Sequence, residues 1–163
     1  MSGANKIFKR QSTANFYGNQ QILDTEEIWV GRNVIAMIAP KPLVPGHCVI
    51  IPKQKVEKFT DLSENETIDL LLITKKISAC LESIYQQVVK TVIEDGLAAG
   101  QELKHLTVNL IPQDPREPLK TRTLDTVDMS DQARVDLIKR IQGILSEGEK
   151  KELSNMSFKS YAN

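Results

Sequence analysis

The chain has 163 residues, and its 21 basic and 21 acidic side chains give it a formal net charge of zero at neutral pH. This balance argues against a broad electrostatic surface for nucleic acid or for an anionic membrane. The length suits one domain that buries about 70% of its unfolded surface, without help from metals or disulfides. No apolar run approaches the ~20 residues of a membrane span and the N-terminus lacks the apolar region of a signal peptide, so we expect a cytoplasmic or nuclear protein.

The first half of the chain predicts a loose terminus followed by short strands. Residues 1–14 are polar and read as a flexible N-terminal arm ahead of a folded domain over 15–112. Between Ile28 and Ile38, two apolar runs flank Gly31-Arg32-Asn33, which predicts a hairpin. Cys48 to Pro52 reads as a further strand.

A long amphipathic helix is predicted after Ser63. Ser63 and Glu66 form a capping-box pattern that should begin the helix. Residues 88–93 allow a change to an extended segment, so the pattern fixes the end of the helix only within a few residues. Apolar side chains recur at steps of three and four and predict one face packed on a sheet: Leu70, Ile73, Ile77, Cys80, Leu81, Ile84 and Val88.

The two cysteines, Cys48 and Cys80, have no metal-ligand spacing. They are expected to be reduced thiols in the core. The sequence therefore predicts neither a metal site nor a cofactor.

The segment from Leu103 to Ile111 is predicted to be a strand with one apolar face and one polar face. Leu106, Val108 and Leu110 alternate with His105, Thr107 and Asn109. The apolar face suits a core. The polar face suits a functional site, although Thr107 and Asn109 would also suit a half-exposed, solvated strand.

Beyond Pro112 the sequence predicts a loop and then helices that pack on the domain as an extension over residues 113–163. Ser130 is a candidate N-cap for a helix that carries apolar residues at helical spacing, and Ser146 with Glu149 predicts the start of a third, short helix. The apolar residues of the first of these helices are Leu137, Ile138, Ile141 and Leu145.

Three blocks of this sequence resemble the histidine triad superfamily. They are Lys41–Pro52 around Pro-Gly-His, Glu94–Gln101 around Asp-Gly-x-x-Ala-Gly-Gln, and His105–Pro112 at the triad itself. Over residues 16–112 the resemblance is nearest to the fragile histidine triad branch, the dinucleoside polyphosphate hydrolases. It implies an α+β, histidine-triad-like fold with an antiparallel sheet, a long central helix, additional C-terminal helices and a homodimeric assembly.

The residues that carry the family's chemistry are largely replaced. In the family the middle histidine attacks the α-phosphate and becomes nucleotidylated, but that position holds Thr107, a poor nucleophile without a base. Asn109 replaces the third histidine and cannot carry a positive charge. Glu94 stands where the family has a phosphate-binding glutamine, and Ala39 where it has the asparagine that holds the ribose hydroxyls.

The resemblance nevertheless leaves a set of candidate nucleotide-binding residues. His47, Gln101 and His105 match the family. For His105 a buried structural role is the alternative, and for Gln101 a structural role and a binding role are equally open. No residue is assigned a catalytic role. The apolar wall that grips the base in the family corresponds to Tyr17, Ile22, Met37 and Val49.

Three functions therefore compete. The first is a catalytically silent histidine-triad domain that acts as a protein-interaction or scaffold subunit, with weak purine-nucleotide binding as an option. The second is a nucleotide sensor. The third is a diadenosine triphosphate hydrolase with displaced chemistry through His47 or His105.

Overall fold

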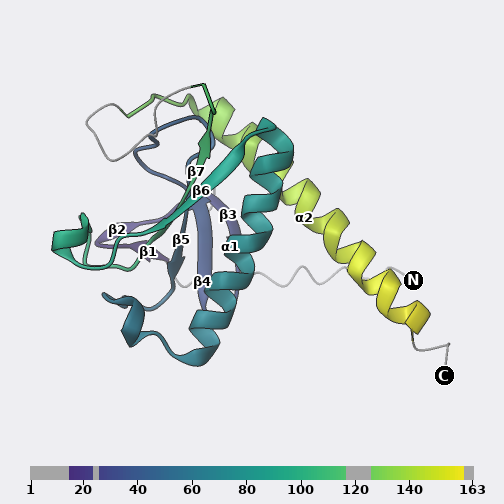
Figure 1. Ribbon diagram of the computed structural model, residues 1–163, viewed down its shortest axis with the longest axis horizontal. Coiled ribbons are helices and arrows are strands. Elements are labelled where there is room, and N and C mark those ends of the chain that lie inside the picture. The colour runs from purple at the N-terminus through teal and green to yellow at the C-terminus, as the bar shows by residue number, and fades with distance from the viewer. Residues whose placement is uncertain (1–14, 24–25, 117–125, 160–163) are drawn as a thin grey trace, which may run out of the picture.

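A five-stranded antiparallel sheet forms the centre of the protein, in the order β3-β4-β5-β7-β6. The computed structural model describes residues 15–23, 26–116 and 126–159, so the predicted N-terminal arm lies outside the described residues. Two helices lie on one side of the sheet and a small two-stranded hairpin lies on the other (Figure 1). The α+β architecture expected from the sequence is thus confirmed.

The first three strands of the sheet follow one another along the chain: β3 (Glu27–Val30), β4 (Val34–Ile38) and β5 (Cys48–Pro52). The hairpin predicted around Gly31-Arg32-Asn33 is confirmed, since β3 pairs antiparallel with β4 and the Gly31 amide donates to the Val34 carbonyl at 2.9 Å. All five residues of β4 and of β5 are buried, as expected for central strands covered on both faces.

Helix α1 (Glu64–Tyr85) begins with the predicted capping box, in which Ser63 and Glu66 satisfy each other's backbone amides. A short 3-10 turn, Phe59–Asp61, precedes it. The helix ends at Tyr85 and Gln86 takes up a left-handed conformation, so Val88 was wrongly counted in the helical stripe. Val88 instead begins strand β6 (Val88–Ile93), the extended segment that the sequence left open, and it is largely exposed.

Strand β7 (Val108–Gln113) begins later than predicted, and His105 and Thr107 lie before its first residue. The Leu106 amide donates to the carbonyl of Val56, in the loop after β5, at 2.7 Å, which removes this stretch from the ladder of the sheet. The apolar face is as predicted, with Leu106, Val108 and Leu110 in the main core. The polar face is not solvated, since His105, Thr107 and Asn109 are all buried.

The C-terminal region forms one helix, α2 (Asp131–Lys159), where two were predicted. Ser130 caps it as expected, since its hydroxyl accepts from the Ala133 amide at 3.3 Å. Ser146 does not begin a new helix. It lies inside the continuous helix α2, where its hydroxyl donates to the Gly143 carbonyl at 2.8 Å. No helix in the described ranges is long and apolar enough to cross a membrane.

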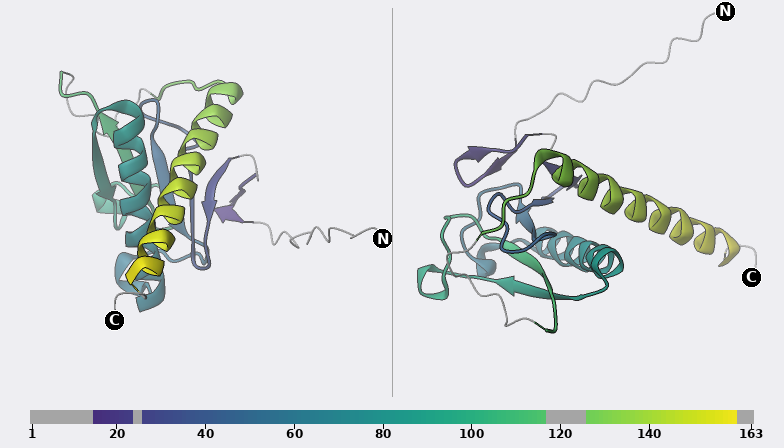
Figure 2. Two further views of the ribbon diagram at one scale, coloured as in Figure 1. Left: turned by 90° about the vertical axis from the view of Figure 1, so that its right-hand side faces the viewer. Right: turned by 90° about the horizontal axis from the view of Figure 1, so that it is seen from above.

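The two faces of the sheet carry separate apolar clusters. The larger one lies between the sheet, α1 and α2, and Ile77 and Ile141 are fully buried in it. The smaller one lies on the opposite face, where Ile35, Met37 and Ile51 pack with Tyr17 and Ile22 from the N-terminal segment. This segment forms the hairpin of β1 (Phe16–Tyr17) and β2 (Gln20–Gln21), which lies apart from α1 in both views of Figure 2.

Candidate functional site

A cavity of about 1110 Å³ opens on the face of the sheet that carries the β1–β2 hairpin. Its floor comes from β5, β6 and β7, with Ala39 just after β4, because the residues that share this face are brought into register: Val49 pairs with Asn109, and Asn109 with Val92. A cavity of this size lies at the upper end for small-molecule sites. Its walls come from the hairpin, the Pro40–Leu43 turn and the segment around a short 3-10 turn, Leu97–Ala99.

His47 lies on the cavity floor with both ring nitrogens in hydrogen bonds. Its Nδ1 accepts from the Leu43 amide at 3.1 Å, so its Nε2 must carry the proton and donate to Asn109 Oδ1 at 3.0 Å. A proton on Nδ1 would make this nitrogen a donor that faces the N–H of Leu43, and the hydrogen bond between them would be lost. The arrangement therefore suits a positioning role better than the supply of positive charge.

His105 is held in the same tautomer by different partners. The Gly18 amide donates to its Nδ1 at 3.1 Å, and its Nε2 donates to the Pro52 carbonyl at 2.7 Å. Burial lowers the pKa of His105 below its ordinary value; the Pro52 hydrogen bond opposes that shift, and the positive charge of Lys55 adds to it. His105 is therefore neutral at pH 7, and both of its ring nitrogens are occupied.

Thr107 occupies the position of the family nucleophile but does not line the cavity. Its hydroxyl lies 3.0 Å from the His105 carbonyl and 3.3 Å from the Tyr17 hydroxyl. Neither partner is a base that would take the threonine proton at neutral pH. The hydroxyl thus ties the backbone to the hairpin.

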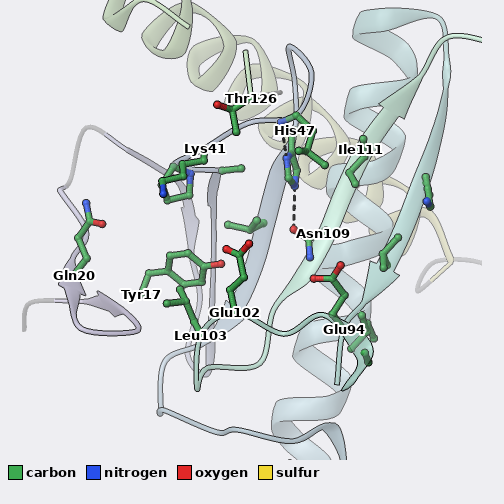
Figure 3. A pocket seen from close by; sticks show the side chains of 18 of the residues that line it. Tyr17, Gln20, Lys41, His47, Glu94, Glu102, Leu103, Asn109, Ile111 and Thr126 are labelled. Atoms are coloured by element: carbon green, nitrogen blue, oxygen red, sulfur yellow. Dashed lines mark hydrogen bonds between the residues drawn. The ribbon is translucent and has the colours of Figure 1, made fainter. Parts of the chain in front are cut away.

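Two carboxylates point toward the place in front of His47 and Asn109 (Figure 3). Glu94 and Glu102 both line the cavity, and the Oε2 atom of Glu94 is shielded from solvent. Lys41, on the turn before His47, and Lys90, on β6, line it as well. A phosphate group in front of His47 and Asn109 would therefore meet carboxylates, while Lys41 and Lys90 supply the positive charge of the lining.

Gln101 has a structural position. Its side-chain oxygen accepts from the Gly96 amide at 2.6 Å, and its nitrogen donates to the Glu57 carbonyl at 2.9 Å. These bonds close the loop between Gly96 and Gln101, where Gly96 and Gly100 have positive φ angles. Gln101 thus holds the loop that carries one wall of the cavity.

The candidate residues divide into two groups. Six of them line the cavity: Tyr17, Ala39, His47, Val49, Glu94 and Asn109. The other five lie behind its surface. Ile22 and Met37 join the smaller apolar cluster. Gln101, His105 and Thr107 are buried and bond to backbone groups.

Sequence reasoning missed part of the lining. Lys90 and Val92 face the cavity because they pair with Ile111 and Asn109 across β6 and β7. The alternation along β6 was the available signal, but its register against β7 could not be read from one strand. The other missed lining residues are Asn19, Gln20, Pro40, Lys41, Leu43, Ile93, Ala99, Glu102, Leu103, Ile111 and Thr126.

An antiparallel sheet with a long capped helix behind it and a Pro-Gly-His turn facing a triad strand defines a histidine-triad class of protein. A family model, the HIT domain, matches residues 24–116, and the chain belongs to this family.

Individual relatives are dinucleoside polyphosphate hydrolases. The chain is 33% identical over 108 residues to a bifunctional bis(5'-adenosyl)-triphosphatase/adenylylsulfatase of Arabidopsis thaliana, covering 64% of this chain and 60% of that protein. It is 30% identical over 102 residues to a bis(5'-adenosyl)-triphosphatase of Dictyostelium discoideum, covering 62% of this chain and 68% of that protein. Among solved structures, a Plasmodium falciparum diadenosine triphosphate hydrolase shares the fold with a TM-score of 0.72 at 21% identity, covering 85% of this chain and 88% of that one.

Proposed function

We propose that this protein is a catalytically silent HIT domain that serves as a protein-interaction or scaffold subunit. The observation that carries the proposal is the position of Thr107, whose hydroxyl is buried against the His105 carbonyl and Tyr17 and lies outside the cavity lining. A group that must attack phosphorus has to reach the substrate with its lone pair free. Loss of a nucleophile alone costs on the order of a million-fold in rate where catalytic groups act as a unit.

The remaining polar groups support the same proposal. His47 and His105 each have both ring nitrogens engaged, so neither is free to act as base or nucleophile in place of Thr107. Asn109 supplies an amide where the family supplies a third imidazole. The carboxylate of Glu94 would oppose the charge that develops on a phosphate oxygen in the transition state.

A second candidate function, nucleotide sensing, is favoured by the cavity itself. Its volume of about 1110 Å³ is enough for a nucleotide, and Tyr17, Ala39 and Val49 give it an apolar wall. Lys41 and Lys90 offer positive charge elsewhere in the cavity lining. We therefore include weak purine-nucleotide binding in the proposal and treat the identity of the protein partner as a separate question.

Isothermal titration with AMP, ADP and diadenosine triphosphate tests both candidates on the same samples, with hydrolysis products measured in parallel. Micromolar binding without products would identify a nucleotide-sensing domain. Absence of binding at millimolar ligand, again without products, would leave the scaffold function. Product formation that His47→Ala or His105→Ala abolishes, while Thr107→Ala leaves it unchanged, would overturn the proposal in favour of displaced hydrolase chemistry.

Restoring the family residues at the replaced positions tests whether those replacements account for the proposed lack of hydrolysis. The triple change Thr107→His, Asn109→His and Glu94→Gln should restore hydrolysis of diadenosine triphosphate if the cavity is otherwise competent. Thr107→His alone should achieve little, because the amide and the carboxylate remain in place. A folded triple variant without activity would show that the cavity itself no longer accepts this substrate.

We also propose a homodimer, in which two sheets join edge to edge. The support is the resemblance and the position of β6 at one edge of the sheet, where Val88 and Ile93 are exposed. Light scattering after size exclusion should give twice the mass of the chain. Because proline cannot donate to a strand ladder, a Val92→Pro change in β6 should disturb this edge and reduce the mass to that of one chain, whereas a monomeric wild type would refute the dimer.

A further inference from the structure

Two of the three triad positions contact the β1–β2 hairpin instead of the cavity. His105 accepts from the Gly18 amide, and Thr107 lies 3.3 Å from the Tyr17 hydroxyl. The same hairpin supplies Tyr17, Asn19 and Gln20 to the cavity wall. We propose that His105 is a positioning residue, a proton-sensitive latch that holds the β1–β2 hairpin in place as one wall of the cavity.

The latch consists of the chain of bonds from Gly18 through His105 to Pro52. Since an amide can only donate and a carbonyl can only accept, the imidazole must be neutral with its proton on Nε2. A proton added to Nδ1 would face the Gly18 N–H directly. The bond to Pro52 can survive protonation, but the bond to the hairpin cannot.

Among the described residues, the β1–β2 hairpin is attached to the sheet by apolar packing and by a small number of hydrogen bonds, which include Asn15 to Glu27 at 2.7 Å and Thr107 to Tyr17 at 3.3 Å. Its two strands pair over only two residues each, and a ladder this short is not stable on its own in water. Ile22 follows it into the smaller apolar cluster, and Lys55 donates to Asn19 at 2.9 Å on the exposed surface. An exposed bond of this kind contributes little, whereas the part-buried Gly18–His105 bond holds the turn of the hairpin directly.

Burial and the charge of Lys55 favour the neutral form of His105, and the hydrogen bond to Pro52 opposes them. The Tyr17 ring faces it from β1 with centroids 6.1 Å apart, and Lys55 approaches from the loop after β5. Its chain neighbour Lys104 lies in an exposed ion pair with Glu57 at 3.8 Å. Burial is the main reason that the pKa of His105 lies below the ordinary 6.5, and the charge of Lys55 adds to it.

The direction of the pH effect follows from that lowered pKa. The unfolded or released histidine takes up a proton near pH 6.5, whereas the latched histidine takes it up only at lower pH. The stabilisation from the latch is therefore fully present above pH 6.5 and is lost as the pH falls through the folded-state pKa. The hairpin is closed at neutral pH and released in acid.

Amide hydrogen exchange of the unliganded protein tests this inference without any nucleotide or partner, and so independently of the proposed function. Between about pH 7.5 and about pH 5, the protection factor of the Gly18 amide, corrected for intrinsic exchange, should fall by about tenfold per pH unit once His105 begins to titrate. Amides of β5 and β7 should stay protected, because the sheet remains folded. The ¹⁵N shifts of His105 report its tautomer and protonation in the same samples.

Two variants separate the latch from a merely structural role. His105→Asn keeps an acceptor near the Nδ1 position but does not titrate, so Gly18 protection should become independent of pH. His105→Gln keeps a donor near Pro52 but leaves no acceptor at the Nδ1 position, so protection should be low at every pH.

Wild-type protection that stays constant while His105 titrates would overturn the inference, as would a His105 tautomer with its proton on Nδ1. The wild-type titration decides the question even if neither variant folds, because it needs no substitution.

Discussion

At the scale of single residues, the tightest constraint near the site lies at Gly46. Its φ is +88°, and an added Cβ would stand 2.4 Å from the Tyr85 ring at the end of α1. Neither the backbone conformation nor the space admits a side chain there. The turn that delivers His47 to the cavity is thus fixed by the packing of Tyr85 against a residue without a side chain.

We therefore expect Gly46→Ala to reduce the free energy of unfolding by about 1–3 kcal/mol and to shift the His47 resonances. Gly143→Ala is the matched control: Gly143 lies in α2 with nothing within 4 Å of an added Cβ, so the change should stabilise by roughly 0.5–1 kcal/mol. Denaturant unfolding of the two variants gives both values. Equal effects would contradict the role of the Tyr85 contact.

At the scale of elements, the capping box of α1 is a local feature that the sequence predicts correctly. Ser63→Ala removes the acceptor for the Glu66 amide and should cost about 0.5–2 kcal/mol of stability. Ser83→Ala, exposed in the same helix, should change stability by less than about 0.5 kcal/mol. Thermal unfolding compares the two, and a similar loss in both would exclude a specific capping effect.

A substitution in helix α2 shows whether the C-terminal extension and the domain unfold as one cooperative unit. Ile141 is fully buried in the main core with residues of α1 and the sheet. Ile141→Ala should cost about 2–5 kcal/mol, in one cooperative transition seen by all probes. Lys139→Ala, exposed on the same helix, is the control. A separate early transition of α2 would show that the extension folds independently.

At the scale of the whole molecule, the two cysteines report the integrity of the core. Burial raises the pKa of Cys48, and the neighbouring Cys80 adds to that shift; burial also raises the pKa of Cys80. The unfolded thiols ionise near pH 9.0, but the folded ones retain their protons to higher pH. The stability contributed by the buried thiols is therefore complete below pH 9.0 and lost as the pH rises toward the folded pKa values.

We accordingly expect the native protein to react slowly with a thiol reagent at pH 8 and the urea-unfolded protein to react at the rate of free cysteine. Comparison of the two rates checks the prediction, with Cys48→Ala and Cys80→Ala showing which thiol is attacked first. Rapid reaction of either thiol in the native protein would mean that the core opens readily at that position.

The sequence determined the features that depend on local pattern. The Ser63–Glu66 box, the hairpin around Gly31-Arg32-Asn33 and the apolar alternation through Leu106, Val108 and Leu110 all rest on residues a few positions apart. The motif blocks around His47 and Gln101 also identified the HIT family before the fold was known.

Only the tertiary structure decided what the triad positions contact. His105 receives its hydrogen bond from Gly18, 87 residues away, and Thr107 meets Tyr17, 90 residues away. The register of β6 against β7 likewise decided that Lys90 and Val92 face the cavity. The physical reason is that a polar group in a core must find a partner wherever the fold brings one, and no local pattern specifies a partner so distant in the chain.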